Sequence, residues 1–383
     1  MNVFKNYIYI IMCIAAVLLT ACSNDSEEAK GVHASFVVKA SAPWFIEEPY
    51  APVQTRMWSP PEGYYSYENI NNQFEGHKSM ENMSIETFFT KNDVAPQQGT
   101  FFYDEHSSSW KLSMDIEQTG NYYLYGFLPK NEATSSSVTA NSTYSNGAVM
   151  TLNGLSTVTP ADICFIAGAK EGTTDENDNG LQTGQFVVNA KATEAGNHNY
   201  IFLLFDHLYA AMRLRYTIDA NYDVLRTVKL RKLELKALPN DDGTPVKAKQ
   251  NAVITLQSNT TGDSPVVGSV VFTPDNSSAD AELELLYEGE VALNTSVPVN
   301  FMGSFIPGST AYFKVRTTYD VYDKKGNLLR EGSTAENTIS LRDIFQTATI
   351  ERGHMFSITF TVQPTYYYVL SGYDLNTPTM EIE

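Results

Sequence analysis

Apolar and polar residues alternate with a period of two along much of this chain. The clearest runs are 212–218, 313–321 and 356–362. Because successive side chains of a strand point to opposite faces, each run predicts a strand with one face on a core and one in water. The alternation in 228–237 slips at Arg231 and Lys232, which predicts a β-bulge there.

Shorter apolar or alternating runs add further strand candidates, at 33–40, 85–90, 109–114, 121–128, 148–152, 163–168, 185–190, 252–256, 266–272, 281–286 and 297–305. Turn sequences at 240–243, 261–263 and 323–327 separate some of them, and the last predicts a hairpin. Helical spacing is scarce, so 220–226 and 340–346 should each form only one or two turns. Many short strands with polar turns predict an all-β protein of sandwiches or barrels.

The first residues have the pattern of a lipoprotein signal peptide, 1–21. Ile8 to Leu19 is uncharged and mostly apolar, but it is too short to cross a bilayer, which needs about 20 residues. Leu19-Thr20-Ala21-Cys22 then has the form of a lipobox, which predicts that Cys22 carries the lipid. Since buried acyl chains contribute about 0.8 kcal/mol per methylene, two or three chains would anchor the protein to a membrane. The alternative is an ordinary secretory signal followed by a chance cysteine.

A polar, acidic stretch, 22–32, follows the lipobox and has nothing to bury, so we expect a disordered tether. Its acidic residues resemble the surface-export signal of Bacteroidetes lipoproteins, and a plain solvated linker is the alternative. The length of 383 residues then suggests two domains. A polar, Gly-containing stretch at 191–199 predicts domains at 33–196 and 197–383, with a boundary near Asn221 as the alternative.

The composition excludes one class of partner. The formal net charge is −18, and removal of Lys5 with the leader makes it more negative by one. Such a surface repels nucleic acid and anionic membranes. We therefore expect no nucleic-acid partner.

Residues with reactive side chains do not form a recognisable active site. Cys13 leaves with the leader and Cys22 is acylated, so Cys164 stands alone in an apolar run and is interpreted as a buried structural residue. His207 also lies among apolar residues, which favours a hydrogen-bonded core or strand-end histidine over a catalytic base. No histidine pair has metal-ligand spacing, and no nucleophile elbow or phosphate loop occurs. We expect no enzyme activity and no cofactor.

One acidic loop resembles part of a calcium site. Residues 175–180 match the first half of an EF-hand loop, but Phe186 stands where the bidentate glutamate is required. We interpret the loop as solvated and expect no metal. An aromatic cluster at 58–67, together with Trp110, could stack on sugars if exposed, or could pack over the end of a sandwich.

Several features together resemble the fimbrillin-like proteins of Bacteroidales, the subunits of type V pili. A lipobox, an acidic tether and an early strand precede Thr55-Arg56 and a Trp/Tyr/Pro stretch. The middle of the chain adds further similarity, at 121–126, at 168–172, and at 205–211 running into Arg213-Leu214-Arg215. The resemblance covers most of the mature chain, although each motif is weak alone.

The resemblance implies two transthyretin-like (Greek-key) β-sandwich domains in tandem and a role as a pilus subunit, tip or anchor at the cell surface. In polymerising members, an Arg-specific protease removes the lipidated segment with its first strand, and a strand from another subunit fills the groove. Here Arg56 is the candidate cleavage site and 35–40 the strand that would leave. Thr365 to Leu370 is either the donated strand or an ordinary C-terminal strand. The rival hypothesis is a surface glycan-binding lipoprotein that uses the aromatics near Trp58 and at Trp110.

Overall fold

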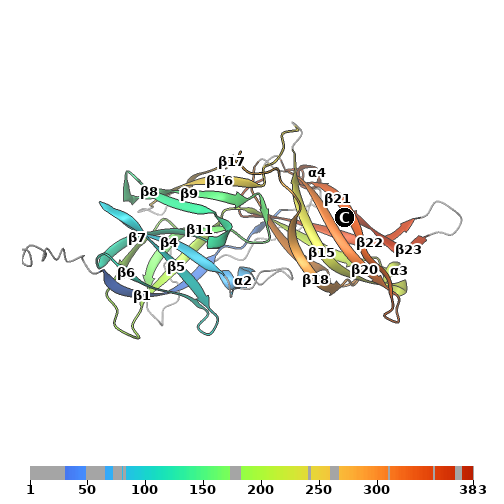
Figure 1. The fold of residues 1–383 in the computed structure, drawn as a ribbon, viewed down its shortest axis with the longest axis horizontal. Coiled ribbons are helices and arrows are strands. Elements are labelled where there is room, and N and C mark those ends of the chain that lie inside the picture. The colour runs from blue at the N-terminus through green and yellow to red at the C-terminus, as the bar shows by residue number, and fades with distance from the viewer. Residues whose placement is uncertain are drawn as a thin grey trace, which may run out of the picture.

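The computed structural model describes residues 31–48, 65–71, 80, 83–172, 183–239, 243–258, 267–308, 311–347, 350–366 and 373–382. Nearly all regular structure in these ranges is β, which confirms the all-β prediction. The molecule is elongated, with two β bodies side by side along its long axis (Figure 1). None of the helices in these ranges is long and apolar enough to cross a membrane.

A closed barrel of seven strands forms the centre of the first body. Its strands follow the order β11-β13-β1-β6-β5-β4-β7, and a pairing between β7 and β11 closes the ring. Their bounds are β1 Val32–Ala42, β4 Ser84–Lys91, β5 Val94–Asp104, β6 Ser109–Ile116, β7 Gly120–Leu128, β11 Cys164–Gly172 and β13 Asn199–His207. Two short strands extend the sheet: β12 (Val187–Ala190) pairs with β7, and β3 (Tyr65–Ser66) pairs with β1.

A four-stranded cover sheet packs on one side of the barrel. Its order is β17-β16-β9-β8, with bounds β8 Ser135–Asn141, β9 Thr143–Ser156, β16 Lys249–Gln257 and β17 Val267–Pro274. Buried side chains of the cover sheet and of the barrel belong to one apolar cluster. In Figure 1 the yellow β16 and β17 lie beside the green β8 and β9, although about 100 residues of chain separate the two pairs.

The second body is a sandwich of two sheets. One has the order β10-β19-β14-β22-β2, with β23 also on β22, and the other has the order β18-β15-β20-β21. The first sheet has the bounds β2 Ile46–Glu47, β10 Val158–Thr159, β14 Ala210–Ile218, β19 Val299–Phe305, β22 His354–Tyr366 and β23 Tyr373–Ile382. The second has β15 Thr227–Leu238, β18 Glu284–Ala292, β20 Tyr312–Tyr322 and β21 Leu328–Ser340. Tyr216 and Thr317 join the two sheets through hydroxyl groups 2.8 Å apart in the buried core.

Several local predictions are confirmed. The pairing of β15 with both neighbours shifts between Leu230 and Lys232, where the alternation slips. The turn at 323–327 joins β20 to β21 as a hairpin. The two short helical segments are α3 (Ala220–Leu225) and α4 (Leu341–Phe345), and the described residues also include the helical turns α2 (Tyr67–Asn71) and η2 (Lys130–Glu132).

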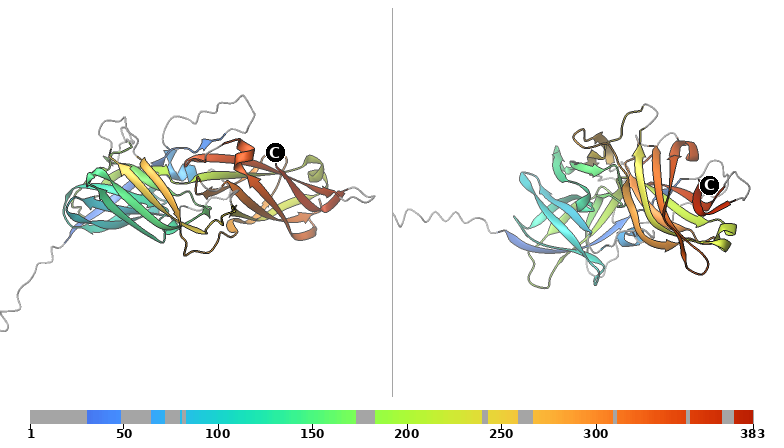
Figure 2. Two further views of the ribbon diagram at one scale, coloured as in Figure 1. Left: turned by 90° about the horizontal axis from the view of Figure 1, so that it is seen from above. Right: turned by 45° about the vertical axis from the view of Figure 1, so that its right-hand side comes forward.

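The domain architecture differs in detail from the expected one. β13, which follows the boundary expected at 197, pairs with β1 and β11, so the barrel continues beyond that position. β16 and β17 belong to the first body although they lie in the C-terminal half of the chain. The tandem transthyretin-like arrangement therefore stays a prediction, and what the structure shows is a barrel with a cover sheet beside a sandwich (Figure 2).

Candidate functional site

The predicted first strand, 33–40, is β1, and it is an inner strand of the barrel wall. β1 pairs in parallel with β13 on one edge and antiparallel with β6 on the other. Its alternate residues Ala34, Phe36, Val38, Ala40 and Ala42 are buried, as the alternation predicts for a strand that faces a core on one side. β1 is therefore hydrogen-bonded along both edges and is not an exposed edge strand.

Phe36 is the largest apolar side chain that β1 places inside the barrel. Its ring centroid lies 5.0 Å from that of Phe89 on β4 and 6.4 Å from that of Phe101 on β5. Phe89 in turn contacts Tyr122 on β7 in an edge-to-face arrangement. Phe36 thus joins β1 to aromatic residues from across the barrel. Truncation of its side chain would leave a large cavity in this cluster.

The chain continues from β1 as a strap, residues 43–48, that crosses to the second body. There β2 pairs in parallel with β22. The backbone N–H groups of Ile46 and Glu48 donate to the carbonyl oxygens of Gly353 and Met355, at 2.9 and 2.8 Å. The N-terminal segment therefore contributes a strand to both bodies.

The side chains of the strap also contact the second body. The Glu47 carboxylate accepts hydrogen bonds from Ser357 at 2.7 Å and from Arg213 at 3.3 Å. The neighbouring Glu48 pairs with His354. These contacts lie beside the β2–β22 pairing and hold the strap to β22 and β14.

A buried polar cluster fixes the start of the strap. His207, at the end of β13, lies with its Nδ1 3.0 Å from Asp162 Oδ1 and 3.5 Å from Cys164 Sγ. Its Nε2 donates to the carbonyl oxygen of Pro43 at 2.8 Å. The Phe45 ring stacks on the imidazole, with centroids 3.8 Å apart. Asp162, Cys164 and His207 are each fully buried, whereas the hydrogen bond to Pro43 in the strap is only partly buried.

The electrostatics of the cluster favour an imidazolium paired with a carboxylate. Burial lowers the pKa of His207, but the charge and hydrogen bond of Asp162, the charge of Asp206 and the Pro43 carbonyl outweigh it and leave that pKa raised. Because a carboxylate and a peptide carbonyl can only accept, both ring nitrogens must donate. At the next residue, Asp206 accepts from Arg352 at 2.6 Å and so has its own counter-charge.

Cys164 is unreactive in this setting. Burial first, and the nearby Asp162 charge second, raise the pKa of its thiol well above the ordinary value. Asp162, Cys164 and His207 form the group of possible metal ligands that the described part of the chain contains. In the imidazolium form that the raised pKa of His207 favours, neither ring nitrogen has a lone pair for an ion. The predictions of a buried structural cysteine and a hydrogen-bonded core histidine are both confirmed.

Most of the other predicted site residues lie outside the part of the chain that the structure describes. Cys22, Arg56, Trp58 and the acidic loop at 175–180 lie outside the described residues. Trp110 is only 2% exposed and packs edge-to-face on Tyr103, so the expectation that it could stack on a sugar is wrong. Thr365 and Tyr366, the first residues of the candidate donor, end β22 and pair with β23.

Two parts of the site were not expected from the sequence. The strap was not recognised because Ile46-Glu47 is too short to show an alternating pattern. The partnership of Asp162 with His207 joins residues 45 apart in the chain. An acidic residue directly before the apolar run 163–168 is the only local sign that it needs a buried partner.

No protein-family model and no curated protein sequence matches the chain. Solved structures of Bacteroides proteins assigned to adhesion and fimbriae share part of its arrangement. A Bacteroides fragilis protein provisionally assigned to cell adhesion is 8% identical, with 91% of this chain and 97% of that chain covered and a TM-score of 0.41. A similarly assigned protein of Bacteroides uniformis is 10% identical, over 91% and 98% of the two chains, with a TM-score of 0.35.

A fimbrial protein of Bacteroides vulgatus is 11% identical, over 79% of this chain and 92% of that chain, with a TM-score of 0.29. The structural neighbours are thus proteins provisionally assigned to cell adhesion and a fimbrial protein. Because all three TM-scores are below 0.5, these similarities carry no argument about what this chain does.

Proposed function

We propose that this protein is a surface fimbrial subunit, held on the outer membrane by lipid on Cys22, that assembles with other subunits by exchange of β1. Cleavage at Arg56 would sever the N-terminal segment from the rest of the chain, and a strand from another subunit would then displace it. The observation that carries the proposal is the position of β1, an inner strand of the barrel wall that is paired along both edges.

Removal of β1 would create a strong acceptor for another strand. It would leave unpaired N–H and C=O groups on β6 and on β13, and it would uncover the apolar interior around Phe89 and Phe101. Each restored backbone hydrogen bond contributes about 0.5–1.5 kcal/mol net. Each large apolar side chain that refills the interior adds about 1.5–3 kcal/mol, less the entropy of ordering the incoming strand.

The strap explains why cleavage alone would not release the segment. A cut at Arg56 would leave β1 held between β6 and β13, Pro43 held by His207, and β2 held by β22. Cleavage would therefore supply the freedom to exchange, while displacement by an incoming strand would supply the driving force. Such a mechanism keeps the precursor monomeric until it has been cut and a strand from another subunit displaces β1.

The proposal assigns a structural role and no catalysis, and the sealed positions of Cys164 and His207 support this. In the same view, the two bodies are variants of two tandem transthyretin-like β-sandwich domains, the first closed by the β7–β11 pairing. A stalk subunit would be cut at Arg56, whereas an anchor at the base of the fibre would keep Cys22 attached. Adhesion to a host or bacterial surface would be a property of the assembled fibre.

The decisive experiment is controlled cleavage of the folded mature chain with an Arg-specific protease. Light scattering after size-exclusion chromatography should show oligomers only after the cut, and peptide mapping should place that cut after Arg56. Arg56→Gln is the matched control and should leave the chain intact at this site and monomeric. Assembly by this route is wrong if wild-type chain cut at Arg56 stays monomeric under assembly conditions.

A further inference from the structure

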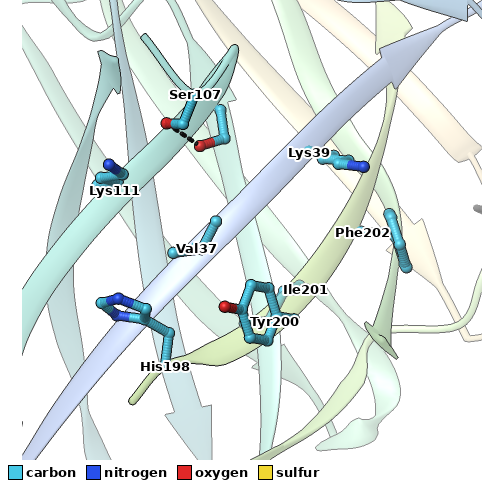
Figure 3. A pocket seen from close by; sticks show the side chains of 9 residues that line it. Val37, Lys39, Ser107, Lys111, His198, Tyr200, Ile201 and Phe202 are labelled. Atoms are coloured by element: carbon cyan, nitrogen blue, oxygen red, sulfur yellow. Dashed lines mark hydrogen bonds between the residues drawn. The ribbon is translucent and has the colours of Figure 1, made fainter. Parts of the chain in front are cut away.

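The outer face of the barrel has a pocket beside β1 that none of the functions discussed above uses. Its volume is about 400 Å³, within the range of about 300–1,000 Å³ found for small-molecule sites. Val37 and Lys39 of β1 line it, together with Lys111 of β6, Tyr200 and Phe202 of β13, and His198 just before β13. Figure 3 shows Val37 between Lys111 on one side and Lys39 on the other, with His198 and Tyr200 along one rim.

Polar groups that lack partners converge on this pocket. Among the described residues, nothing forms an ion pair or hydrogen bond with the Lys39 ammonium or the Tyr200 hydroxyl. Lys111, in contrast, pairs with Asp104. Lys39 is therefore the positive charge that remains available to a ligand, in a chain whose net charge is −18. Its position in a concave site favours an anionic ligand.

Side chains at the rim of the pocket contact one another or neighbouring side chains. His198 Nδ1 and Ser35 Oγ lie 2.8 Å apart, and the His198 ring packs at 88° against Tyr200 with centroids 6.2 Å apart. On the opposite side, the hydroxyl groups of Ser107 and Ser109 lie 2.7 Å apart. Groups held in this way lose little conformational entropy when a ligand binds.

We propose that this pocket binds an acidic saccharide, a pyranose ring that carries one carboxylate. The ammonium of Lys39 matches the single negative charge of a uronic or sialic acid. The partly exposed Tyr200 ring offers a flat face for the C–H side of the sugar, and its hydroxyl can bond a sugar hydroxyl. None of the described residues that line the pocket is an arginine, which disfavours a phosphate ligand, since phosphate is commonly held by a bidentate guanidinium.

β1 supplies Lys39 and Val37, so the complete site exists only while β1 is in the barrel. Ligand binding does not depend on strand exchange. A test with uncleaved protein therefore separates ligand binding in this pocket from assembly by strand exchange. The uncleaved mature chain is titrated with trigalacturonic acid and with 3′-sialyllactose, and lactose serves as the neutral comparison. Calorimetry should show binding of at least one acidic probe and none of lactose, and binding should weaken as salt rises.

Two variants and a matched control locate the site. Lys39→Gln and Tyr200→Ala should each weaken the affinity for the acidic probe at least tenfold, whereas Lys236→Gln, a surface lysine on β15, should leave it within twofold. Lys39 is exposed, so Lys39→Gln should fold even if Tyr200→Ala does not. The proposal is overturned if neither acidic probe binds at millimolar concentration, or if both pocket variants bind like wild type. It is also overturned if inorganic phosphate binds as tightly, because the site would then recognise any anion.

Discussion

The imidazole of His207 donates through Nε2 to the carbonyl oxygen of Pro43, 2.8 Å away, and so joins the end of β13 to the first residue after β1. The same ring uses Nδ1 for Asp162, which fixes its orientation. A buried charged pair thus holds the point where the chain leaves the barrel for the second body.

Loss of either partner of the buried pair should be strongly destabilising. His207→Ala should lower the free energy of unfolding by about 3–5 kcal/mol, because it leaves the Asp162 carboxylate buried without its counter-charge. Urea unfolding followed by tryptophan fluorescence measures this. The matched control is His33→Ala, whose pair with Asp115 is exposed and should contribute less than about 1 kcal/mol.

A double-mutant cycle tests whether the pair acts as a unit. Asp162→Ala combined with His207→Ala should cost clearly less than the sum of the two single changes, since the double variant leaves no buried charge unpaired. Simple additivity of the three measurements would contradict the assignment of a charged pair.

The stability of the protein should fall as the pH rises above about 6.5, the ordinary pKa of histidine. The raised pKa of His207 means that the folded state keeps its proton where the unfolded state has lost it. The stabilisation is therefore complete below about pH 6.5 and disappears as the pH rises through the folded-state pKa. Unfolding free energies of wild type and His207→Ala, measured from pH 6 upward, should converge. A difference that is independent of pH would show that His207 is not charged in the folded state.

Phe36 should be the most sensitive position of β1. Phe36→Ala should cost about 3–5 kcal/mol, because the barrel cannot close around the space next to Phe89 and Phe101. Val37→Ala on the same strand faces outward and should cost about 1 kcal/mol or less. Amide exchange should also be faster along β1 in the Phe36 variant. Equal losses of stability for the two substitutions would mean that Phe36 does not pack inside the barrel while Val37 faces outward.

Gly126 should not tolerate a side chain. A Cβ at this position would lie 2.1 Å from the carbonyl oxygen of Glu86 and 3.0 Å from Cα of Thr87, both backbone atoms of β4. Gly126→Ala should therefore push β4 away from β7 and destabilise the protein by about 1–3 kcal/mol. Gly268→Ala is the control, because its nearest neighbour is the flexible Gln257 side chain at 3.1 Å. Thermal unfolding of the two variants compares them directly, and similar melting temperatures would refute the prediction.

The sequence predicts local structure well where one face is buried and the other is exposed. The bulge at Arg231 and Lys232, the hairpin at 323–327 and the strand at 33–40 are all visible as changes in alternation or as turn residues. β13 was not predicted because most of it is buried on both faces, so its sequence is a continuous apolar run without alternation. β8 was missed for the opposite reason, since its serines and threonines face solvent and give little apolar signal.

Pairing between distant strands could not be predicted from the sequence. Nothing local to β16 indicates that it pairs with β9, or that β1 lies between β6 and β13, because many strands have similar alternation. The contacts within the site also join residues that are distant in the sequence. Burial of Cys164 and His207 could be inferred from their apolar neighbours, but the contacts of His207 with Asp162 and Pro43 depend on the assembled barrel.

The double pairing of β1 also has a mechanical consequence. β1 begins at the end of the first body that is far from the second body, and it runs obliquely toward the second body (Figure 2). A pull applied at Gly31 along β1 loads the hydrogen bonds to β6 and to β13 in shear. These bonds lie across the direction of the force, so they bear it together. An edge strand peeled from its end would lose its bonds one by one. Fluid drag on a molecule tethered by its N-terminus would therefore meet the full resistance of both ladders, whereas an incoming strand could replace the same bonds in sequence.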